Sequence, residues 1–184
     1  MKGSARVGLA IAALVAVLAA WLIVKPSGES VALDLINAFP TAKDRRPTPE
    51  TFDVIDATIS GETHRAIHPK DPSRIIWSVN VPENGWLYVD IGLLEQSWTM
   101  QGDGVLFMVG VSDGNTFDDL LSLVVNPFGN PNDRKWQPLK IDLSAYAGKT
   151  VDLIFNTRSS PPDPPRDDRN GDLPVWGDPR IVTR

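Results

Sequence analysis

The residues best suited to ligand chemistry lie in two polar segments, of which the first is Glu95–Asp103. This segment contains Trp98, Gln101 and Asp103. An indole offers a flat apolar face for a sugar ring, and the amide and carboxylate beside it can hydrogen-bond sugar hydroxyls. The same tryptophan could instead pack on the end of the domain or against a partner protein. The three residues are therefore a candidate carbohydrate site.

The second polar segment spaces oxygen donors as a calcium loop does. Its donors are Asp168, Asn170 and Asp172. Calcium takes roughly six to eight oxygen ligands, and an EF-hand would also need a glycine and a bidentate glutamate further on. Leu173 and Pro179 occupy those two positions. The segment is either a structural calcium site or a solvated loop.

No constellation in the sequence predicts catalysis. His64 and His68 have the spacing of a helical zinc pair, but a proline follows and the context is strand-like, so we expect surface residues. Asp113, Asp118 and Asp119 could act as acid and base, but loop solubility explains them better. The chain has no cysteine, nucleophile motif or phosphate-binding loop. We therefore expect a binding protein and no enzyme.

A proline-rich segment, Ser159–Pro174, is a candidate contact with a partner protein. Its prolines limit the freedom lost on ordering, and its charges could pair across an interface. The charged residues proposed for this role are Asp163, Arg166, Asp167 and Arg169. The alternative is a solvated connection between two strands.

Alternating apolar residues predict the elements that position these segments. Apolar side chains recur at every second position in short runs separated by Gly, Pro, Asn and Asp, which is typical of antiparallel strands. We expect an all-β fold, an antiparallel two-sheet jelly-roll β-sandwich of roughly eight to ten strands, with long loops at Pro40–Glu50 and Ser159–Pro174. The runs are Val31–Leu35, Phe52–Ile59, Ile75–Val79, Trp86–Ile91, Val105–Val111, Leu139–Leu143, Val151–Phe155 and Val175–Val182.

An uncharged apolar run, Val7–Val24, precedes the sandwich. As a helix it would be roughly 27 Å long, enough to cross a bilayer core. Lys2 and Arg6 would then stay in the cytoplasm and the following domain would lie in the periplasm or outside the cell. A cleaved signal peptide is the alternative, with small residues near Ala19 as its cleavage site. The run extends beyond the length that a signal peptide needs, which favours a retained single-pass anchor in the inner membrane.

The distribution of charge also separates the first 25 residues from the rest of the chain. The sequence carries 18 basic and 23 acidic residues, and three of the basic ones lie in residues 1–25. The remainder has 15 basic against 23 acidic residues, a net charge of −8. Such an acidic domain disfavours nucleic acid as a partner. We therefore divide the chain into an anchor, residues 1–25, and an extracytoplasmic domain, residues 26–184.

Two C-terminal stretches carry a family resemblance. They read WQPLKIDLSAYAGKTVDLIFNT from Trp136 and WGDPRIV from Trp176. This pattern resembles the last strands of galactose-binding-like jelly-roll domains, the fold of many carbohydrate-binding modules. The resemblance implies the fold and sometimes a structural calcium ion. It specifies the ligand poorly, because this fold carries many functions.

Two functions compete at this point. The first is a non-catalytic accessory subunit that stabilises a larger membrane-protein complex; the chain weakly resembles the extra periplasmic subunits of bacterial photosynthetic reaction-centre and antenna complexes. The second is a carbohydrate-binding module displayed at the cell surface. Copurified membrane proteins would favour the first, and direct glycan binding would favour the second.

Overall fold

The computed structural model describes residues 28–70, 72–159 and 168–184. The segment expected to be a membrane anchor lies outside these residues. Within the described ranges no helix has the length and apolar character needed to span a membrane. The sandwich itself is formed by Ser30–Thr183.

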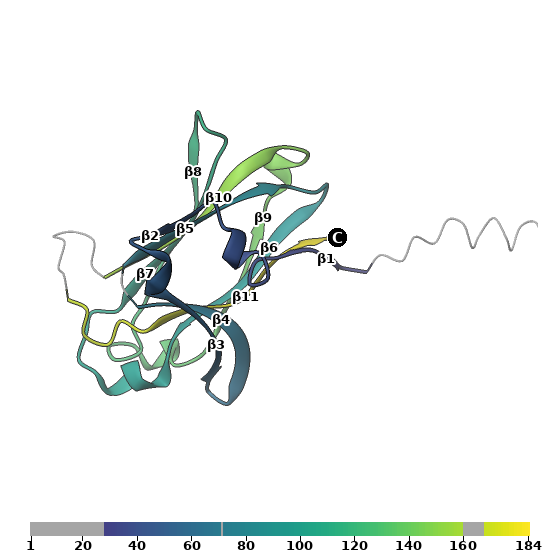
Figure 1. The fold of residues 1–184 in the computed structure, drawn as a ribbon. Coiled ribbons are helices and arrows are strands. Elements are labelled where there is room, and N and C mark those ends of the chain that lie inside the picture. The colour runs from purple at the N-terminus through teal and green to yellow at the C-terminus, as the bar shows by residue number, and fades with distance from the viewer. Residues whose placement is uncertain (1–27, 71, 160–167) are drawn as a thin grey trace, which may run out of the picture. The chain divides into compact units, whose positions relative to one another are not determined.

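In the described part of the chain, two antiparallel sheets hold all the strands (Figure 1). The first sheet has the order β3-β4-β11-β6-β9, with β1 also paired to β11, and the second has the order β2-β5-β10-β7-β8. The strands are β1 (Ser30–Asp34), β2 (Asp44–Arg46), β3 (Phe52–Ile59), β4 (Glu62–Pro69), β5 (Ser73–Asn80), β6 (Gly85–Leu93), β7 (Val105–Ser112), β8 (Phe117–Val125), β9 (Gln137–Asp142), β10 (Thr150–Ser159) and β11 (Pro174–Thr183).

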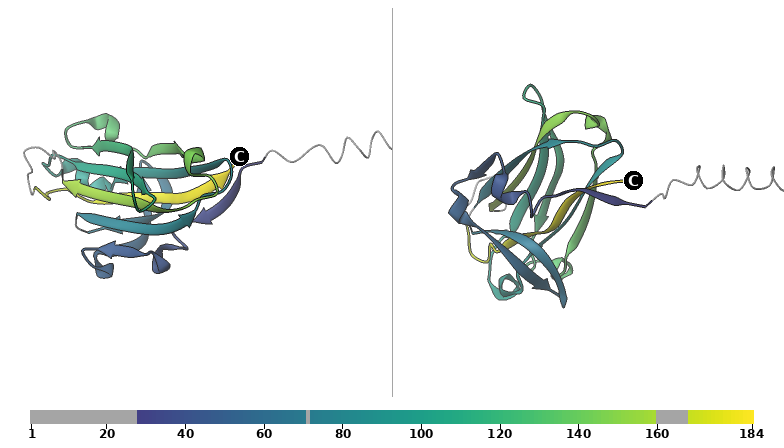
Figure 2. Two further views of the ribbon diagram at one scale, coloured as in Figure 1. Left: turned by 90° about the horizontal axis from the view of Figure 1, so that it is seen from above. Right: turned by 45° about the vertical axis from the view of Figure 1, so that its right-hand side comes forward.

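The sheets face each other as two layers, which Figure 2 shows from two further sides. From β4 to β7 successive strands alternate between the sheets, and β10 and β11 do so again. This alternation is typical of a jelly roll. The helical segments in the described ranges are short 3-10 turns, such as the one at Glu95–Thr99. The expected all-β two-sheet sandwich is confirmed.

Aromatic side chains fill the space between the sheets. Trp176 on β11 is fully buried, and its ring centroid lies 4.9 Å from that of Phe107 and 4.5 Å from that of Phe155. Within the second sheet, the ring centroid of Trp77 lies 5.1 Å from that of Phe155. The contacts of Trp176 join β11 of one sheet to β7 and β10 of the other. The core is therefore continuous across the two layers.

Three strands lie where no apolar run predicted one. Short β2 interrupts the expected loop Pro40–Glu50. Strand β4 is polar on most of one face, and β8 is an edge strand with mostly exposed or half-exposed side chains. Apolar alternation detects strands that bury one face, so it could not reveal these three. The eight runs that it did identify all correspond to strands.

The segment that carries the family resemblance forms a tight turn after β9. The backbone N–H of Ser144 donates to Asp142 Oδ1 at 2.8 Å, and Gly148 has a φ of +72°, which favours glycine. The Tyr146 hydroxyl donates to Asp118 Oδ2 at 2.7 Å and its ring packs against the core.

Replacing the central tryptophan should strongly destabilise the folded domain. We expect Trp176→Ala to lower the free energy of unfolding by about 3–5 kcal/mol, because it leaves a cavity between the two sheets. Phe128→Ala removes an aromatic ring that is 43% exposed and should change stability by no more than about 0.5 kcal/mol. Chemical denaturation of both variants measures the contrast, and equal losses would contradict the role given to Trp176.

Candidate functional site

The ends of strands from both sheets gather at one end of the sandwich, here called the distal end. The last residues of β10 pair with the first residues of β5 and β7, as Thr157 does with Ser73 and Ser159 with Val105. The start of β11 likewise pairs with the end of β6. The connections that follow β4, β6 and β10 therefore start from the same end. They carry most of the residues that the sequence singled out.

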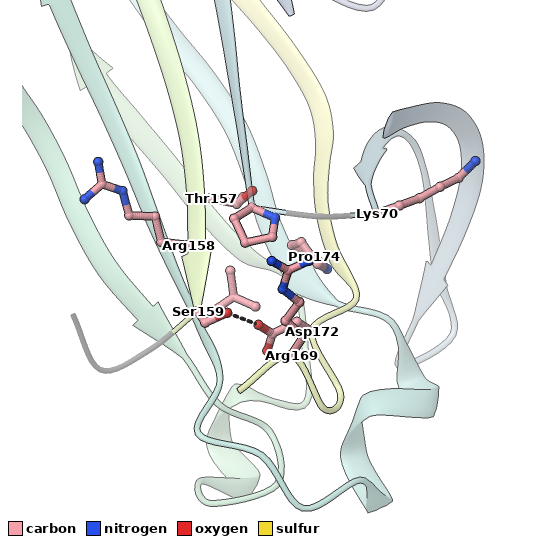
Figure 3. A pocket seen from close by; sticks show the side chains of 9 residues that line it. Lys70, Thr157, Arg158, Ser159, Arg169, Asp172 and Pro174 are labelled. Atoms are coloured by element: carbon pink, nitrogen blue, oxygen red, sulfur yellow. Dashed lines mark hydrogen bonds between the residues drawn. The ribbon is translucent and has the colours of Figure 1, made fainter. Parts of the chain in front are cut away.

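Two adjoining pockets open at the distal end. The first encloses about 40 Å³ and is lined by Lys70, Pro72, Val105, Thr157, Arg158, Ser159, Arg169, Asp172 and Pro174. Figure 3 shows Lys70 and Arg158 on opposite sides of it, with Ser159 and Asp172 between them. The second encloses about 280 Å³ and is lined by Arg46, Pro47, Pro72, Ser73, Arg74, Asn156, Thr157 and Arg158. Three residues line both pockets, so the two form one continuous depression.

Positive charge concentrates in the second pocket, which we call the basic groove. It contains Arg46, Arg74 and Arg158. Arg46 pairs with the carboxylate of Asp44 at 2.5 Å, and Arg74 donates from Nε to the Asn156 amide oxygen at 2.7 Å. Arg158 is exposed. Among the described residues that line the groove, the charged groups are these three guanidinium groups, so the groove is positive in a domain whose net charge is negative.

A partly buried carboxylate, that of Asp172, lines the first pocket. Its Oδ2 accepts a hydrogen bond from the Ser159 hydroxyl at 2.9 Å, while its Oδ1 is buried without a hydrogen bond. Burial raises the pKa of Asp172 to about 6, and the nearby Asp103 and Asp168 carboxylates act in the same direction. Negative charge therefore gathers beside the basic groove.

The structure brings the two polar segments of the sequence together at the distal end. The side-chain amide of Asn170 donates to the backbone oxygen of Gln101, and Asp103 lies close enough to Asp172 to raise its pKa. The sequence offered no sign of this proximity, because the two segments lie about 70 positions apart.

Trp98 occupies a more covered position than a stacking platform would. It lies in the 3-10 turn Glu95–Thr99 and is half-buried against a small apolar cluster that includes Trp136. The guanidinium carbon of Arg134 lies 5.9 Å from its ring centroid. The indole N–H is buried without a hydrogen bond. A sugar could use this ring only at its exposed edge.

The candidate calcium donors fit a cation in part. Asp172 offers a buried oxygen without a hydrogen bond, which a cation would satisfy. Asp168, however, uses Oδ1 to accept from the backbone N–H of Asn170 at 3.0 Å, and the Asn170 amide is directed at Gln101. These hydrogen bonds leave Asp168 Oδ2 and Asn170 Oδ1 as the oxygens that a cation could take.

The partner-contact residues are only partly visible. Asp163, Arg166 and Asp167 lie outside the described residues. Arg169 is exposed and lines the first pocket.

A third cluster was missed by the sequence analysis. His64, expected at the surface, has a side chain only 14% exposed, and its Nδ1 lies 2.6 Å from Asp178 Oδ2. Burial acts to lower the pKa of His64, but the neighbouring carboxylates of Asp178 and Glu62 outweigh it and raise the pKa overall. Burial also raises the pKa of Asp90, which completes the cluster. The usable signal was the strand period, which puts His64 and His68 on one face of β4.

Comparison with known proteins identifies the fold and leaves the family open. No protein-family model matches the chain. An uncharacterised protein from Archaeoglobus fulgidus is 36% identical over 104 residues, which cover 56% of this chain and 25% of that protein. The chain thus spans about a quarter of the length of that relative.

Solved structures with the same fold are carbohydrate-binding modules. The family 51 module (CBM51) of Clostridium perfringens GH95, in complex with methyl-galactose, has a TM-score of 0.55 at 13% identity; 85% of this chain and 100% of that chain are covered. A chain of Clostridium perfringens ZmpB with an M60 catalytic domain and two CBM51 domains has a TM-score of 0.58 at 14% identity, covering 85% of this chain and 15% of that one. The chain therefore has the galactose-binding-like sandwich fold of these modules.

The buried carboxylate at the distal end predicts an unusual pH dependence. The pKa of Asp172 is about 6 in the folded state against an ordinary 3.8, so the folded chain holds this proton more tightly. Its contribution to stability is then greatest below pH 4 and is lost as pH rises through 6. Asp172→Asn should be more stable than the parent at pH 8, by on the order of 1 kcal/mol after solvent screening, and equal to it near pH 3.5.

Thermal unfolding in EDTA at several pH values tests this, and Asp113→Asn is the control of opposite sign. Backbone N–H groups of Thr116 and Asn115 donate to the Asp113 carboxylate and lower its pKa. Asp113→Asn should therefore be less stable than the parent at pH 8. A constant offset for Asp172→Asn at every pH would refute the prediction.

Proposed function

We propose that this chain is a non-catalytic carbohydrate-binding domain that takes an acidic saccharide in the basic groove. The single observation that carries the proposal is the groove itself, a depression of about 280 Å³ lined by three arginines, an asparagine amide and two hydroxyl residues. Amides, hydroxyls and guanidinium groups are the donors that bind sugar hydroxyls and carboxylates. The galactose-binding-like fold of carbohydrate-binding modules supports the same function.

The charge of the groove favours an acidic sugar over a neutral one. A guanidinium group presents planar paired donors that match a carboxylate or a sulfate. Arg158 is exposed, and Arg46 is also exposed although it pairs with the Asp44 carboxylate, so both are accessible to a ligand. The domain as a whole carries a negative net charge, so a cluster of three arginines is a favourable place for an anionic ligand. A uronate or sulfated saccharide fits this distribution of charge.

Paired strands support the groove. Thr157 is buried and its hydroxyl lies 2.8 Å from that of Ser73, which locks β10 to β5 beneath the arginines. Pro47 and Pro72 stand at the rim. A rigid floor holds the charged side chains in place and lowers the entropy cost of binding.

Placement at a membrane is a separate part of the proposal. It rests on the apolar run Val7–Val24, which lies outside the described residues. A partner protein would also have to contact Ser159–Pro174, of which residues 160–167 lie outside them as well. No observation on the described residues or in the comparisons supports a subunit of a photosynthetic complex. The carbohydrate-binding hypothesis is therefore preferred over the accessory-subunit hypothesis.

Direct binding measurements test the proposal. The purified full chain is applied to immobilised neutral and acidic oligosaccharides, and the hits are measured by calorimetry. Arg158→Ala should raise the Kd for an acidic oligosaccharide roughly tenfold, because it removes a charge-assisted hydrogen bond. Arg46→Ala should act in the same direction, and added salt should weaken binding.

The matched control is Lys149→Ala, which removes an exposed positive charge from the turn after Gly148, away from the groove. It should leave the Kd unchanged. Binding of neutral sugars alone would preserve carbohydrate binding and refute the acidic class. No binding to either set would overturn the proposal.

A further inference from the structure

Three neighbouring strands of the first sheet place a histidine and two carboxylates together. His64 comes from β4, Asp90 from β6 and Asp178 from β11, and β11 lies between the other two strands. Their ligand atoms all lie within 4.8 Å of one another. We propose that these residues form a binding site for a divalent transition-metal ion of the zinc class. This site is independent of the basic groove and of the proposed carbohydrate binding.

The distances suit such an ion after small movements. His64 Nδ1 lies 2.6 Å from Asp178 Oδ2 and 3.6 Å from Asp90 Oδ2. In a tetrahedral zinc site with bonds of about 2.0–2.2 Å, neighbouring ligand atoms lie roughly 3.4 Å apart. Opening the first distance by less than about 1 Å therefore makes room for the metal. The same short distance is also compatible with a simple hydrogen bond, which is the competing explanation.

A bulge in β11 directs Asp178 toward the histidine. The pairing of β11 with β6 shifts register between Gly177 and Arg180, and Asp178 has a φ of +41°. A bulge redirects side chains, and a positive φ is costly for a residue with a Cβ. Such strain is common where a side chain serves a function. Here it puts a carboxylate 2.6 Å from a ring nitrogen.

Surrounding residues fix the orientation of the imidazole. The ring of Trp136 meets that of His64 edge-on, with centroids 4.7 Å apart, and the Trp136 N–H donates to the backbone oxygen of Glu62 at 3.0 Å. The Glu62 carboxylate lies 3.1 Å from His64 Nε2, although the angle falls short of a hydrogen bond. A carboxylate behind the second nitrogen is the usual support of a metal-bound histidine. It would keep the proton on Nε2 and leave Nδ1 for the metal.

Gly177 makes this arrangement possible. A Cβ at that position would lie 2.9 Å from the Trp136 ring and 3.2 Å from the His64 Cβ. Only glycine lets the tryptophan lie against β11 and hold the histidine in place. The Trp136 ring therefore holds His64 in place, and the bulge in β11 holds Asp178.

The donor set and the local charge select the class of ion. A ring nitrogen with two carboxylates suits zinc and its neighbours, whereas calcium prefers oxygen donors throughout. Three carboxylates, from Glu62, Asp90 and Asp178, outnumber the cations His64 and Arg180, so a divalent ion would relieve the excess of negative charge. The Asp178 side chain is 40% exposed, which gives the ion a way in.

Metal titration of the full chain tests the site. Protein stripped with EDTA and dialysed is titrated with Zn²⁺ by calorimetry, in parallel with Asp90→Asn, Asp178→Asn and His64→Ala. We expect one equivalent of Zn²⁺ to bind, and each substitution to raise the Kd at least about tenfold. The two asparagine variants keep the side-chain shape, and far-ultraviolet circular dichroism without metal checks that they remain folded.

His68→Ala is the matched control. His68 lies on the same strand and its Nδ1 is 2.8 Å from the backbone oxygen of Pro174, outside the cluster. It should leave Zn²⁺ binding unchanged. Absent binding would show that His64 and Asp178 form only a hydrogen bond and would overturn the proposal. Tighter binding of Ca²⁺ than of Zn²⁺, or equal losses in the control and the three variants, would also overturn it.

Discussion

The burial of Trp176 fixes the orientation of β11, the strand on which the described sandwich depends most. Trp176 lies between Phe107 and Phe155 of the opposite sheet, and so sets which face of β11 points inward. A shift of one residue would turn the indole into solvent. The opposite face of the same strand then carries Gly177, and the bulge at Asp178 follows directly. One core contact thereby positions residues on both sides of the sheet.

The same strand connects the two chemically distinct regions. Its first residue, Pro174, lines a distal pocket, and its backbone oxygen lies within hydrogen-bond distance of His68 Nδ1. Further along the strand, Asp178 lies beside His64. The distal region gathers arginines against an acidic background, and the outer face gathers carboxylates around a histidine. Because β11 pairs with three strands, the residues that it contributes to the two regions stand on a strongly constrained strand. Rigid elements of this kind hold ligand-binding groups more accurately than free loops.

The sequence pattern predicted the fold more completely than it predicted the sites. Alternation located every strand that buries one face, such as β7 and β10, but polar β4 has no apolar alternation and was not recognised. Consequently, His64 was expected at the surface, since its partners Asp90 and Asp178 lie 26 and 114 positions away and meet it only through strand pairing. Trp98 was identified as a residue of a polar loop, but contact with Arg134 could not be foreseen from local spacing. The proximity of Gln101 and Asn170 was hidden for the same reason.

The pairing of β1 with β11 has a topological consequence. Ser30 lies opposite Thr183, and their hydroxyls are 2.6 Å apart, so the sandwich starts and finishes at neighbouring points. Domains with adjacent ends tolerate insertion into other chains and circular permutation. Pro174 at the start of β11 lines the first pocket, which adjoins the groove, whereas Thr183 lies at the finish of the strand, about ten residues further along. A linker joined at either end therefore leaves the groove accessible, which makes this sandwich a portable unit.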